Sequence, residues 1–266
     1  RNRANHGSYG FWLGGSDQTI LIGNEAAFNG RPDGFHNAPE AGFGHGGIVI
    51  VGGSSSHTRI EGNNLHDNHG AGIAFRGDVQ SKGQAWRAEH WIVQGNRITQ
   101  NRVGVWGRWG SAILLAANTF AGNDKDLDIE ETTDLIELPR AGVEALEPKA
   151  SLIGPQIVIT GQPARFDAGF SRDPLGRPLQ FLWWLGGAAG HGAQFERTFA
   201  EPGFYRLGLT VHNGALGSLA WRDLIVVAPV ARELGQDGPA HDWGFELEGN
   251  DQGRGREEVR LEVGVD

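Results

Sequence analysis

The sequence predicts an all-β protein in two parts, a stack of repeating coils followed by a sandwich of short strands. Three observations support this fold class. The 266 residues include 43 glycines without a collagen period, which indicates many tight turns. Asparagine pairs recur at a regular spacing over the first half of the chain. Strand-like runs alternate with turn residues over the second half.

The first part contains a repeat marked by two asparagines five residues apart. The pairs are Asn24 and Asn29, Asn63 and Asn68, Asn96 and Asn101, and Asn118 and Asn123. Their first members are separated by 39, 33 and 22 residues, and Asn5 lies 24 residues before Asn29, so the unit has about 22 residues with two insertions. The second residue after each first asparagine is apolar in all four units (Ala26, Leu65, Ile98 and Phe120).

A feature that recurs at such a period is usually architectural. The segment "GNNLHDNHGAG" at residues 62–72 looks like a metal or catalytic site when it is taken alone. Because its asparagines match those of the other units, we expect them at the corners of a coil. His66 and His69 fall at positions that other units fill with unrelated residues, so we expect both to be surface turn residues.

Short β-rich runs in each unit predict the strands. The runs "TILIGN", "TRIEGN", "HWIVQGN" and "ILLAAN" contain the first asparagines, and the triplets "FWL", "IVI", "IAF", "VWG" and "LDI" begin at residues 11, 48, 73, 105 and 127. Short strands with stacked corner asparagines and no helical period are typical of a parallel β-solenoid. Residues 1–140 resemble the right-handed parallel β-helix repeat proteins, the group with pectate-lyase-like folds. In such a stack, an inward asparagine passes amide hydrogen bonds from coil to coil.

A different pattern follows a linker that we expect at residues 141–154. Between residues 155 and 228, strand-like runs alternate with Gly, Pro and Asp turns every 8 to 12 residues, as in a β-sandwich. The motifs "FDAGFSRDPLGRPL", "FLWW" and "EPGFYRLGLTVHNG" in this stretch resemble a PKD domain, an immunoglobulin-like module of extracellular proteins. That family's Trp-Asp-Phe-Gly-Asp-Gly signature is present only as "WWLGGA" from Trp183, without either aspartate. The ion or polar-network role of those aspartates therefore does not carry over.

The last segment, residues 229–266, is expected to be a linker followed by strand-like runs. These runs either open a third module or fold back as extra strands on the sandwich.

Composition excludes several classes of protein. No cysteine is present, which rules out a disulfide framework and a zinc-thiolate site. The net charge is -9 and no Lys or Arg cluster could follow a phosphate backbone, so we expect no nucleic-acid partner. No run approaches 18 apolar residues, so we expect no membrane span. The first ten residues contain neither a methionine nor the apolar core of a signal peptide, and we interpret the chain as part of a longer bacterial protein, secreted or at the cell surface, with further domains.

The triplets predict which side chains lie on the surface of the solenoid. Their first and third residues should point inward, so the middle residues form an outward column of Trp12, Val49, Ala74, Trp106 and Asp128. Trp12 and Trp106 would lie three coils apart, about 14 Å at 4.8 Å per coil. Exposed indoles match the C–H faces of pyranose rings, so this column predicts an oligosaccharide site. The alternative is that the long insertions cover both indoles.

The next outward column reads Gly14, Val51, Arg76, Arg108 and Glu130. Two guanidinium groups on adjacent coils repel each other unless an anion lies between them. Arg76 and Arg108, with Asp78 and Trp109 beside them, are therefore candidates to bind the carboxylate of a uronic acid. The alternative is an ion-pair ladder in which Arg108 pairs with Glu130 and Arg76 with Asp78.

Two insertions flank this surface, and long loops on a rigid solenoid often carry binding and catalytic residues. The first begins at Gly30 and carries His36, Glu40 and His45. The second begins at Arg76 and carries six residues of interest, namely Asp78, Lys82, Trp86, Arg87, Glu89 and His90. His36 and His45 are candidate bases or ligands. Because no metal-site spacing is present, no metal site is predicted, and a bound Ca²⁺ is left as an open alternative.

The resemblance to β-helix enzymes implies three chemistries. Lyases of that group remove the C5 proton of a uronate with a basic residue, a role for which Arg76, Arg108, His36 and His45 are the candidates. Hydrolases of the group use paired aspartates on the outer face, and here Asp128 and Glu130 lie two apart on one strand. The alternative is that these two residues form a solvated cap, because they occur in the last coil beside "EETTD". Epimerases share the logic of the lyases. None of these families' diagnostic catalytic strings is present.

We therefore predict an extracellular protein that binds a polysaccharide or cell-surface glycan. If it is an enzyme, the expected activity is lyase-like on an acidic glycan. The rival hypothesis is a non-catalytic structural or adhesive protein, with the β-helix as a rod and the PKD-like domain as a spacer.

Overall fold

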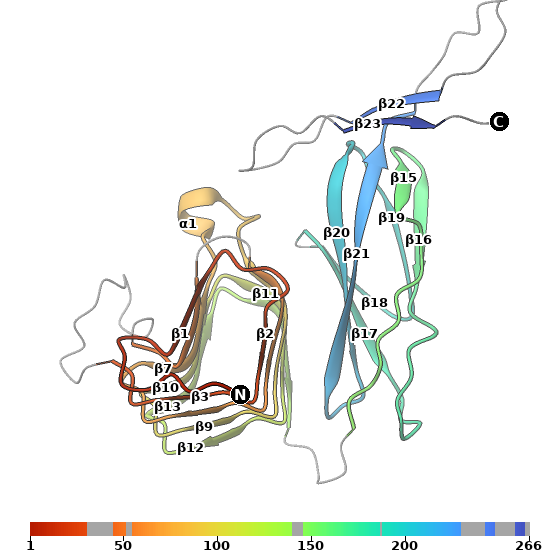
Figure 1. The fold of residues 1–266 in the computed structure, drawn as a ribbon. Coiled ribbons are helices and arrows are strands. Elements are labelled where there is room, and N and C mark those ends of the chain that lie inside the picture. The colour runs from red at the N-terminus through yellow and green to blue at the C-terminus, as the bar shows by residue number, and fades with distance from the viewer. Residues whose placement is uncertain are drawn as a thin grey trace, which may run out of the picture.

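The computed structural model describes residues 1–30, 45–51, 55–139, 146–186 and 188–229, and a strand pair at residues 243–247 and 259–263. Over these ranges the predicted fold class is confirmed, because a parallel β-helix precedes an immunoglobulin-like sandwich and nearly all regular structure is strand. Figure 1 looks along the stack of coils and shows the two domains side by side.

Three parallel sheets form the walls of the solenoid. Sheet B comprises β1 (Phe11–Gly14), β4 (Ile48–Val51), β7 (Ala71–Arg76), β10 (Val103–Arg108) and β13 (Lys125–Glu130). Sheet C comprises β2 (Ile20–Ile22), β5 (Ser56–Glu61), β8 (Ala88–Gln94), β11 (Gly110–Ala116) and β14 (Thr133–Leu138). Sheet A comprises β3 (Glu25–Ala27), β6 (Asn64–His66), β9 (Arg97–Thr99) and β12 (Thr119–Ala121). Each coil, counted from coil 1 (β1 to β3) to coil 5 (β13 and β14), adds one strand to sheets B and C.

Two buried columns of asparagine side chains hold the corners between coils, as the repeat predicts. Asn68 shows the pattern: its Oδ1 accepts hydrogen bonds from the backbone N–H and the Nδ2 of Asn29, at 3.2 and 2.9 Å. Its own Nδ2 donates to Oδ1 of Asn101 at 2.8 Å and to the backbone oxygen of Ala26 at 3.0 Å. Each amide therefore satisfies turn backbone in two coils, which is why a buried polar residue is stable at this position.

The position of Asn5 differs from the prediction. Asn2 and Gly7 take the corner positions above Asn24 and Asn29, with an offset of 22 residues in both cases. Asn5 instead bonds through its side chain to Glu25 Oε1 at 2.7 Å. The offset of 22 residues agrees with the predicted unit of about 22 residues, and Gly7 takes the corner position that Asn29 has in the next coil.

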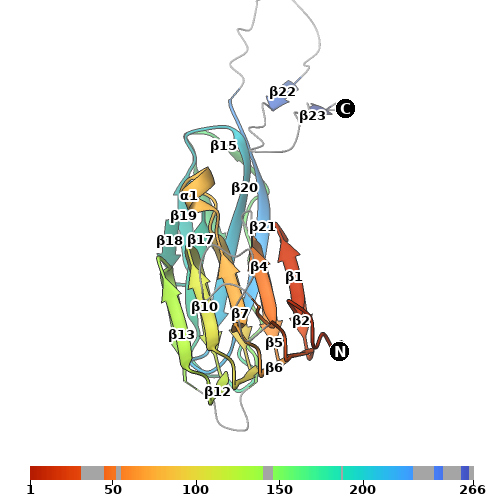
Figure 2. The ribbon, with the colours of Figure 1, turned by 90° about the vertical axis from the view of Figure 1, so that its left-hand side faces the viewer.

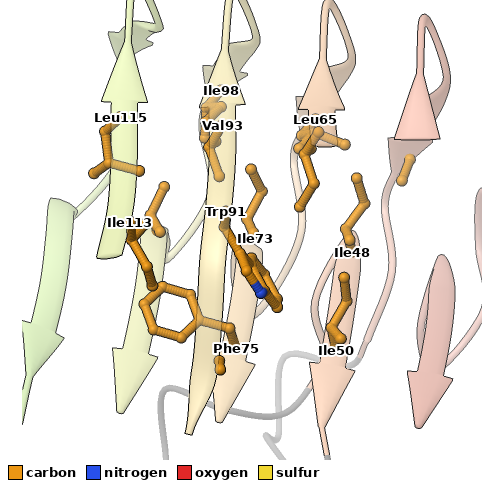
Figure 3. Close-up of a cluster of buried hydrophobic side chains, with 14 residues drawn as sticks. Ile48, Ile50, Leu65, Ile73, Phe75, Trp91, Val93, Ile98, Ile113 and Leu115 are labelled. Atoms are coloured by element: carbon orange, nitrogen blue, oxygen red, sulfur yellow. The ribbon is translucent and has the colours of Figure 1, made fainter. Parts of the chain in front are cut away.

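The core of the solenoid lies between the three sheets, and Figure 3 shows side chains from all of them meeting there. The largest member is Trp91, which is fully buried and donates from Nε1 to the backbone oxygen of Ser55 at 3.0 Å. The first and third residues of the triplets line this core as predicted, among them Phe11, Leu13, Ile48, Ile50, Ile73 and Phe75. The middle residues therefore face outward.

The second domain is a sandwich of two sheets. Sheet F has five strands in the order β15 (Ile157–Ile159), β21 (Gly217–Val227), β20 (Gly203–His212), β17 (Gln180–Leu185) and β18 (Ala188–His191). The other sheet pairs β16 (Pro163–Asp167) with β19 (Gln194–Thr198). Phe166, Trp183 and Leu207 are buried between the two sheets. Trp183 donates a hydrogen bond from Nε1 to the backbone oxygen of Gly192 at 2.8 Å. This bond involves neither of the two signature positions at which the aspartates are missing.

The structure shows how the chain pairs just before the sandwich and in the tail after it. Lys149 and Ile153 lie in the expected linker, yet they form β-bridges with Arg172 and Asp167 and so belong to the sandwich. In the tail, β22 (Trp243–Leu247) and β23 (Val259–Val263) pair with each other as a separate antiparallel sheet and add no strand to sheet F. Within the described residues, no helix is long and apolar enough to cross a membrane.

The sandwich packs along the solenoid through the outer faces of sheets C and F (Figures 1 and 2). Leu219 of β21 contacts a buried apolar group on sheet C that includes Ile92 and Leu114. Gln94 accepts a hydrogen bond from the backbone N–H of Gly217 at 3.0 Å. A Cβ on Gly217 would overlap the Leu114 side chain, so this close approach requires glycine. The two domains thus share an interface, and the sandwich is docked against the solenoid.

Candidate functional site

The outer surface of sheet B carries most of the predicted site residues, in the predicted register. Backbone pairing places Trp12, Val49, Ala74, Trp106 and Asp128 in one column across the five strands. The second column is Gly14, Val51, Arg76, Arg108 and Glu130. We refer to this surface, with the segment Gly77–Arg87 that follows β7, as the sheet B face. Both columns therefore lie on the strands of a parallel sheet.

Only one of the two predicted indoles is exposed. Trp12 has 49% of its surface accessible, and its ring packs edge to face on Tyr9 with centroids 4.4 Å apart. Partial burial raises the pKa of the Tyr9 hydroxyl above its usual value, so Tyr9 stays neutral at physiological pH. Tyr9 and Trp12 form an aromatic platform at the first coil.

The prediction that Trp106 offers an exposed indole is wrong. Trp106 is 1% exposed and belongs to a small apolar cluster on the outer side of the sheet, with Val49, Ala74 and Val103. The guanidinium carbon of Arg108 lies 4.7 Å from the centre of its ring. A cation over an indole face is attractive, so the arginine covers the surface that a sugar would otherwise contact.

The two arginines are neutralised by neighbouring carboxylates, as the ion-pair alternative predicted. Arg108 Nη2 lies 3.3 Å from Asp128 Oδ1 and 3.5 Å from Glu130 Oε2. Arg76 lies 3.8 Å from Asp78 Oδ1 and stacks over the ring of Trp109 at 4.7 Å. Both arginine side chains are largely covered, at 14% and 16% exposure. Asp128 and Glu130 share Arg108, which leaves this acidic pair engaged in a structural contact.

The segment after β7 is fixed against the end of sheet B. It contains the short helix α1 (Val79–Lys82), and Lys82 lies 4.2 Å over the ring of Trp86. Arg87 donates from Nη1 to the backbone oxygens of Gly110 and Glu131, at 3.1 and 2.8 Å. The backbone oxygen of Trp86, which is half-buried, accepts a hydrogen bond from the N–H of Asp78 at 2.7 Å, so the two ends of this segment are joined.

Of the two histidine candidates, only His45 lies within the described residues. His45 is buried at 3% exposure and its ring lies 6.2 Å from that of Tyr9. His36 and Glu40 lie outside the described residues. His66 pairs with the neighbouring Asp67 at 2.6 Å and His69 is exposed, as expected for turn residues. Over the described ranges, no group of three His, Asp or Glu side chains could hold a metal ion.

A second group of buried ionisable residues lies at the interdomain interface, and the sequence analysis did not identify it as a group. His57 and His90 occupy the same position in successive coils, both with φ of 57°, and their rings are 4.7 Å apart. Burial, with the charges of His90 and Arg206, lowers the pKa of His57 to about 2, and burial lowers the pKa of His90 to about 4. Burial raises the pKa of Glu89 to about 8. Both histidines and the glutamate side chain are therefore neutral at pH 7.

Hydrogen bonds fix the orientation of His57. Ser56 donates from Oγ to Asp17 Oδ1 at 2.9 Å, and the Nδ1–H of His57 can then donate to the same Oγ at 2.8 Å. The Nε2 atom of His57 has no hydrogen-bond partner among the described residues, and the His57 ring packs edge to face against Trp184 and Trp221 of the sandwich. The left-handed conformation turns both imidazoles toward the second domain. The sequence contained one indication of this buried pair, because histidine occupies the same position in two successive coils.

Comparison with known protein families assigns both domains. Residues 35–137 match the family model described as right handed beta helix region, and residues 145–220 match the PKD domain model. A search of curated protein sequences finds no match. This pair of domains suggests a surface or carbohydrate-related protein, and PKD domains are typical of extracellular proteins and often mediate adhesion.

Proposed function

Because the chain joins a right-handed β-helix region to a PKD domain, we propose that it is an extracellular surface protein that binds polysaccharide through the sheet B face. The observation that carries this proposal is the Tyr9–Trp12 platform. It presents a half-exposed indole, supported from one edge, on the sheet opposite to sandwich-covered sheet C. A supported aromatic face binds the C–H surface of a sugar ring with little loss of side-chain entropy.

The contacts of the arginines favour binding over cleavage. A lyase would use a cationic group to neutralise the carboxylate of its substrate, and a second group to remove a proton. Arg76 and Arg108 already share Asp78, Asp128 and Glu130, so a uronate would have to compete with these carboxylates. We therefore propose a glycan-binding, adhesive role without catalysis, in which Arg76 and Arg108 orient the tryptophans.

The test combines binding and product assays on a panel of neutral and acidic polysaccharides. We expect Trp12→Ala to weaken binding by about tenfold, the loss of about 1.4 kcal/mol that a single aromatic contact can supply. The matched control is Phe170→Ala, which removes an aromatic ring that is 63% exposed on the sandwich and should leave affinity unchanged. Equal losses in the two variants would refute the platform.

Cleavage is followed in the same samples by ultraviolet absorbance for unsaturated products and by reducing ends. We expect neither signal to rise. Products that disappear in Arg76→Gln or Arg108→Gln, while Phe170→Ala keeps full activity, would overturn the non-catalytic proposal and support a lyase.

A further inference from the structure

Three aromatic rings meet at the corner between sheets A and B, and we refer to them as the corner platform. The imidazole of His6 lies nearly parallel to the ring of Phe28, with centroids 5.1 Å apart and 7° between the planes. The imidazole of His66 meets the same phenyl ring edge to face at 5.5 Å. This corner is on the side of the solenoid away from the sandwich (Figure 1). The platform is therefore on the part of the solenoid that the second domain leaves uncovered.

Backbone hydrogen bonds between coils fix the corner platform. His6 donates its N–H to the backbone oxygen of Ala27 at 3.2 Å, and Phe28 donates its N–H to the backbone oxygen of His66 at 3.3 Å. All three rings are thus attached to one hydrogen-bonded ladder. Because the rings are positioned before a ligand arrives, binding to them costs little conformational entropy.

Phe28 is an unexpected residue for its position. Its backbone is left-handed, with φ of 57°, a conformation that is unfavourable for a bulky side chain. The equivalent positions in the next three coils are also left-handed, and they hold Asp67, Gln100 and Gly122. The phenyl ring is 45% exposed, so burial explains little of its presence. An exposed ring that is kept at a conformational cost indicates a role in binding.

Polar groups border the ring of Phe28. Asp67 Oδ2 lies 2.6 Å from Nδ1 of His66, which orients the imidazole so that Nε2 is the nitrogen that can bond to a ligand hydroxyl group. The side chains of His66 and Asp67 are 18% and 34% exposed. A sugar ring presents C–H groups on its faces and hydroxyl groups at its rim, so it matches an aromatic face with a few polar groups beside it.

The corner platform is close along the chain to the Tyr9–Trp12 platform. His6, Tyr9 and Trp12 follow one another at intervals of three residues. The span from His6 to Trp12 is therefore at most about 20 Å, at about 3.3–3.6 Å per residue. An oligosaccharide of several units is long enough to contact both platforms, whereas a disaccharide on the indole of Trp12 is not.

We propose that His6, Phe28 and His66 form a second sugar subsite, which binds a further unit of the same glycan chain that contacts Trp12. This inference rests on the proposed function of the sheet B face. It adds that the glycan passes from sheet B around the corner to sheet A. The protein then recognises an extended segment of a polysaccharide and not a single terminal sugar.

The dependence of binding on chain length tests this subsite. Disaccharide and octasaccharide fragments of polygalacturonate, the acidic probe, and of a soluble β-glucan, the neutral probe, are titrated and followed by protein NMR, which also measures weak affinities. Trp12→Ala should weaken the binding of both lengths. Phe28→Asn should weaken the octasaccharide by about fivefold and leave the disaccharide unchanged.

The matched control is Gln100→Asn, at the equivalent left-handed position two coils away, which should leave both affinities unchanged. Because asparagine tolerates a left-handed backbone, Phe28→Asn should keep the melting temperature of the wild-type chain. A lower melting temperature with unchanged affinities would assign Phe28 a structural role and overturn the subsite.

The outcomes separate this inference from the proposed function. If Trp12→Ala weakens binding and Phe28→Asn weakens neither length, or weakens both equally, the subsite is overturned and the sheet B site stands. If Phe28→Asn weakens the octasaccharide and Trp12→Ala does not, the sheet B site fails and a shared glycan chain is overturned with it. Binding of neither series by the wild-type chain would overturn both.

Discussion

The buried ionisable residues at the interdomain interface predict a stability optimum near pH 6.5, with losses on both sides. On the alkaline side, burial raises the pKa of Glu89 to about 8 in the folded protein, against an ordinary value of 4.5. The folded state therefore holds a proton that the unfolded state releases, and stability falls as the pH rises. Between pH 6.5 and 8 the Glu89 carboxyl group by itself lowers the free energy of unfolding by about 2 kcal/mol, at about 1.4 kcal/mol per pH unit.

On the acidic side, the two histidines dominate. Their folded pKa values of about 2 and about 4 lie below the ordinary value of 6.5, so the unfolded state binds protons that the folded state does not bind. Between pH 6.5 and 5 the pair costs about 3 kcal/mol, because each unfolded histidine is already half-protonated at pH 6.5. Glu89 returns about 2 kcal/mol, because acid reduces its own penalty, and the expected net loss over this range is about 1 kcal/mol.

Urea unfolding, followed by tryptophan fluorescence at pH 5, 6.5 and 8, measures both limbs. Glu89→Gln should remove the alkaline loss and raise the acidic loss to about 3 kcal/mol, because the compensating carboxyl group is gone. His90→Asn, which tolerates the left-handed backbone, should nearly remove the acidic limb. A stability that rises steadily from pH 5 to pH 8, with no change of slope in Glu89→Gln, would refute the reasoning.

Three further predictions follow from contacts described above. Asn68→Ala removes hydrogen bonds in two neighbouring coils and should lower the free energy of unfolding by roughly 2–4 kcal/mol in a urea titration, whereas a loss below about 0.5 kcal/mol would contradict the ladder. Gly217→Ala should force the sandwich away from Leu114 and speed proteolysis between the domains, and an unchanged digestion pattern would show that the interface adapts. Arg108→Ala uncovers the indole of Trp106, so acrylamide quenching of tryptophan fluorescence should increase; unchanged quenching would mean that other side chains keep it buried.

The periodicity of the sequence determines the solenoid to the level of single residues. The triplets at Trp12, Ala74 and Trp106 predicted the strand register correctly, because stacking requires equivalent residues to meet at each 4.8 Å step. Periodicity tells which way a side chain points. It does not tell what covers that side chain, and for this reason the exposure of Trp106 was predicted wrongly and the docking of the sandwich on sheet C was not predicted.

A signal for the docking was nevertheless present. The run "AILLA" at residues 112–116 is apolar at every position. Its outward residues Leu114 and Ala116 are therefore expected to be buried against another part of the protein, as the inward residues are. Continuous apolar runs are typical of strands that are buried on both faces. The pairing of Arg108 with Asp128 had a weaker basis in the sequence. Residues in one column are neighbours, but the choice between a ligand and a neighbouring carboxylate depends on rotamers that spacing does not determine.

The asparagine ladder also bears on how the protein ages chemically. Asn29 precedes Gly30, and an Asn-Gly pair in a flexible chain deamidates when the glycine nitrogen attacks the asparagine side chain. Here the N–H of Gly30 is engaged with the backbone oxygen of Gly7 at 2.8 Å, and the Asn29 amide is bonded to Ala4 and Asn68. An attacking nitrogen and an amide that are both held in a buried stack cannot reach the ring-closing geometry. The corner that aligns the coils thereby also protects the most labile dipeptide of the solenoid from slow conversion to aspartate.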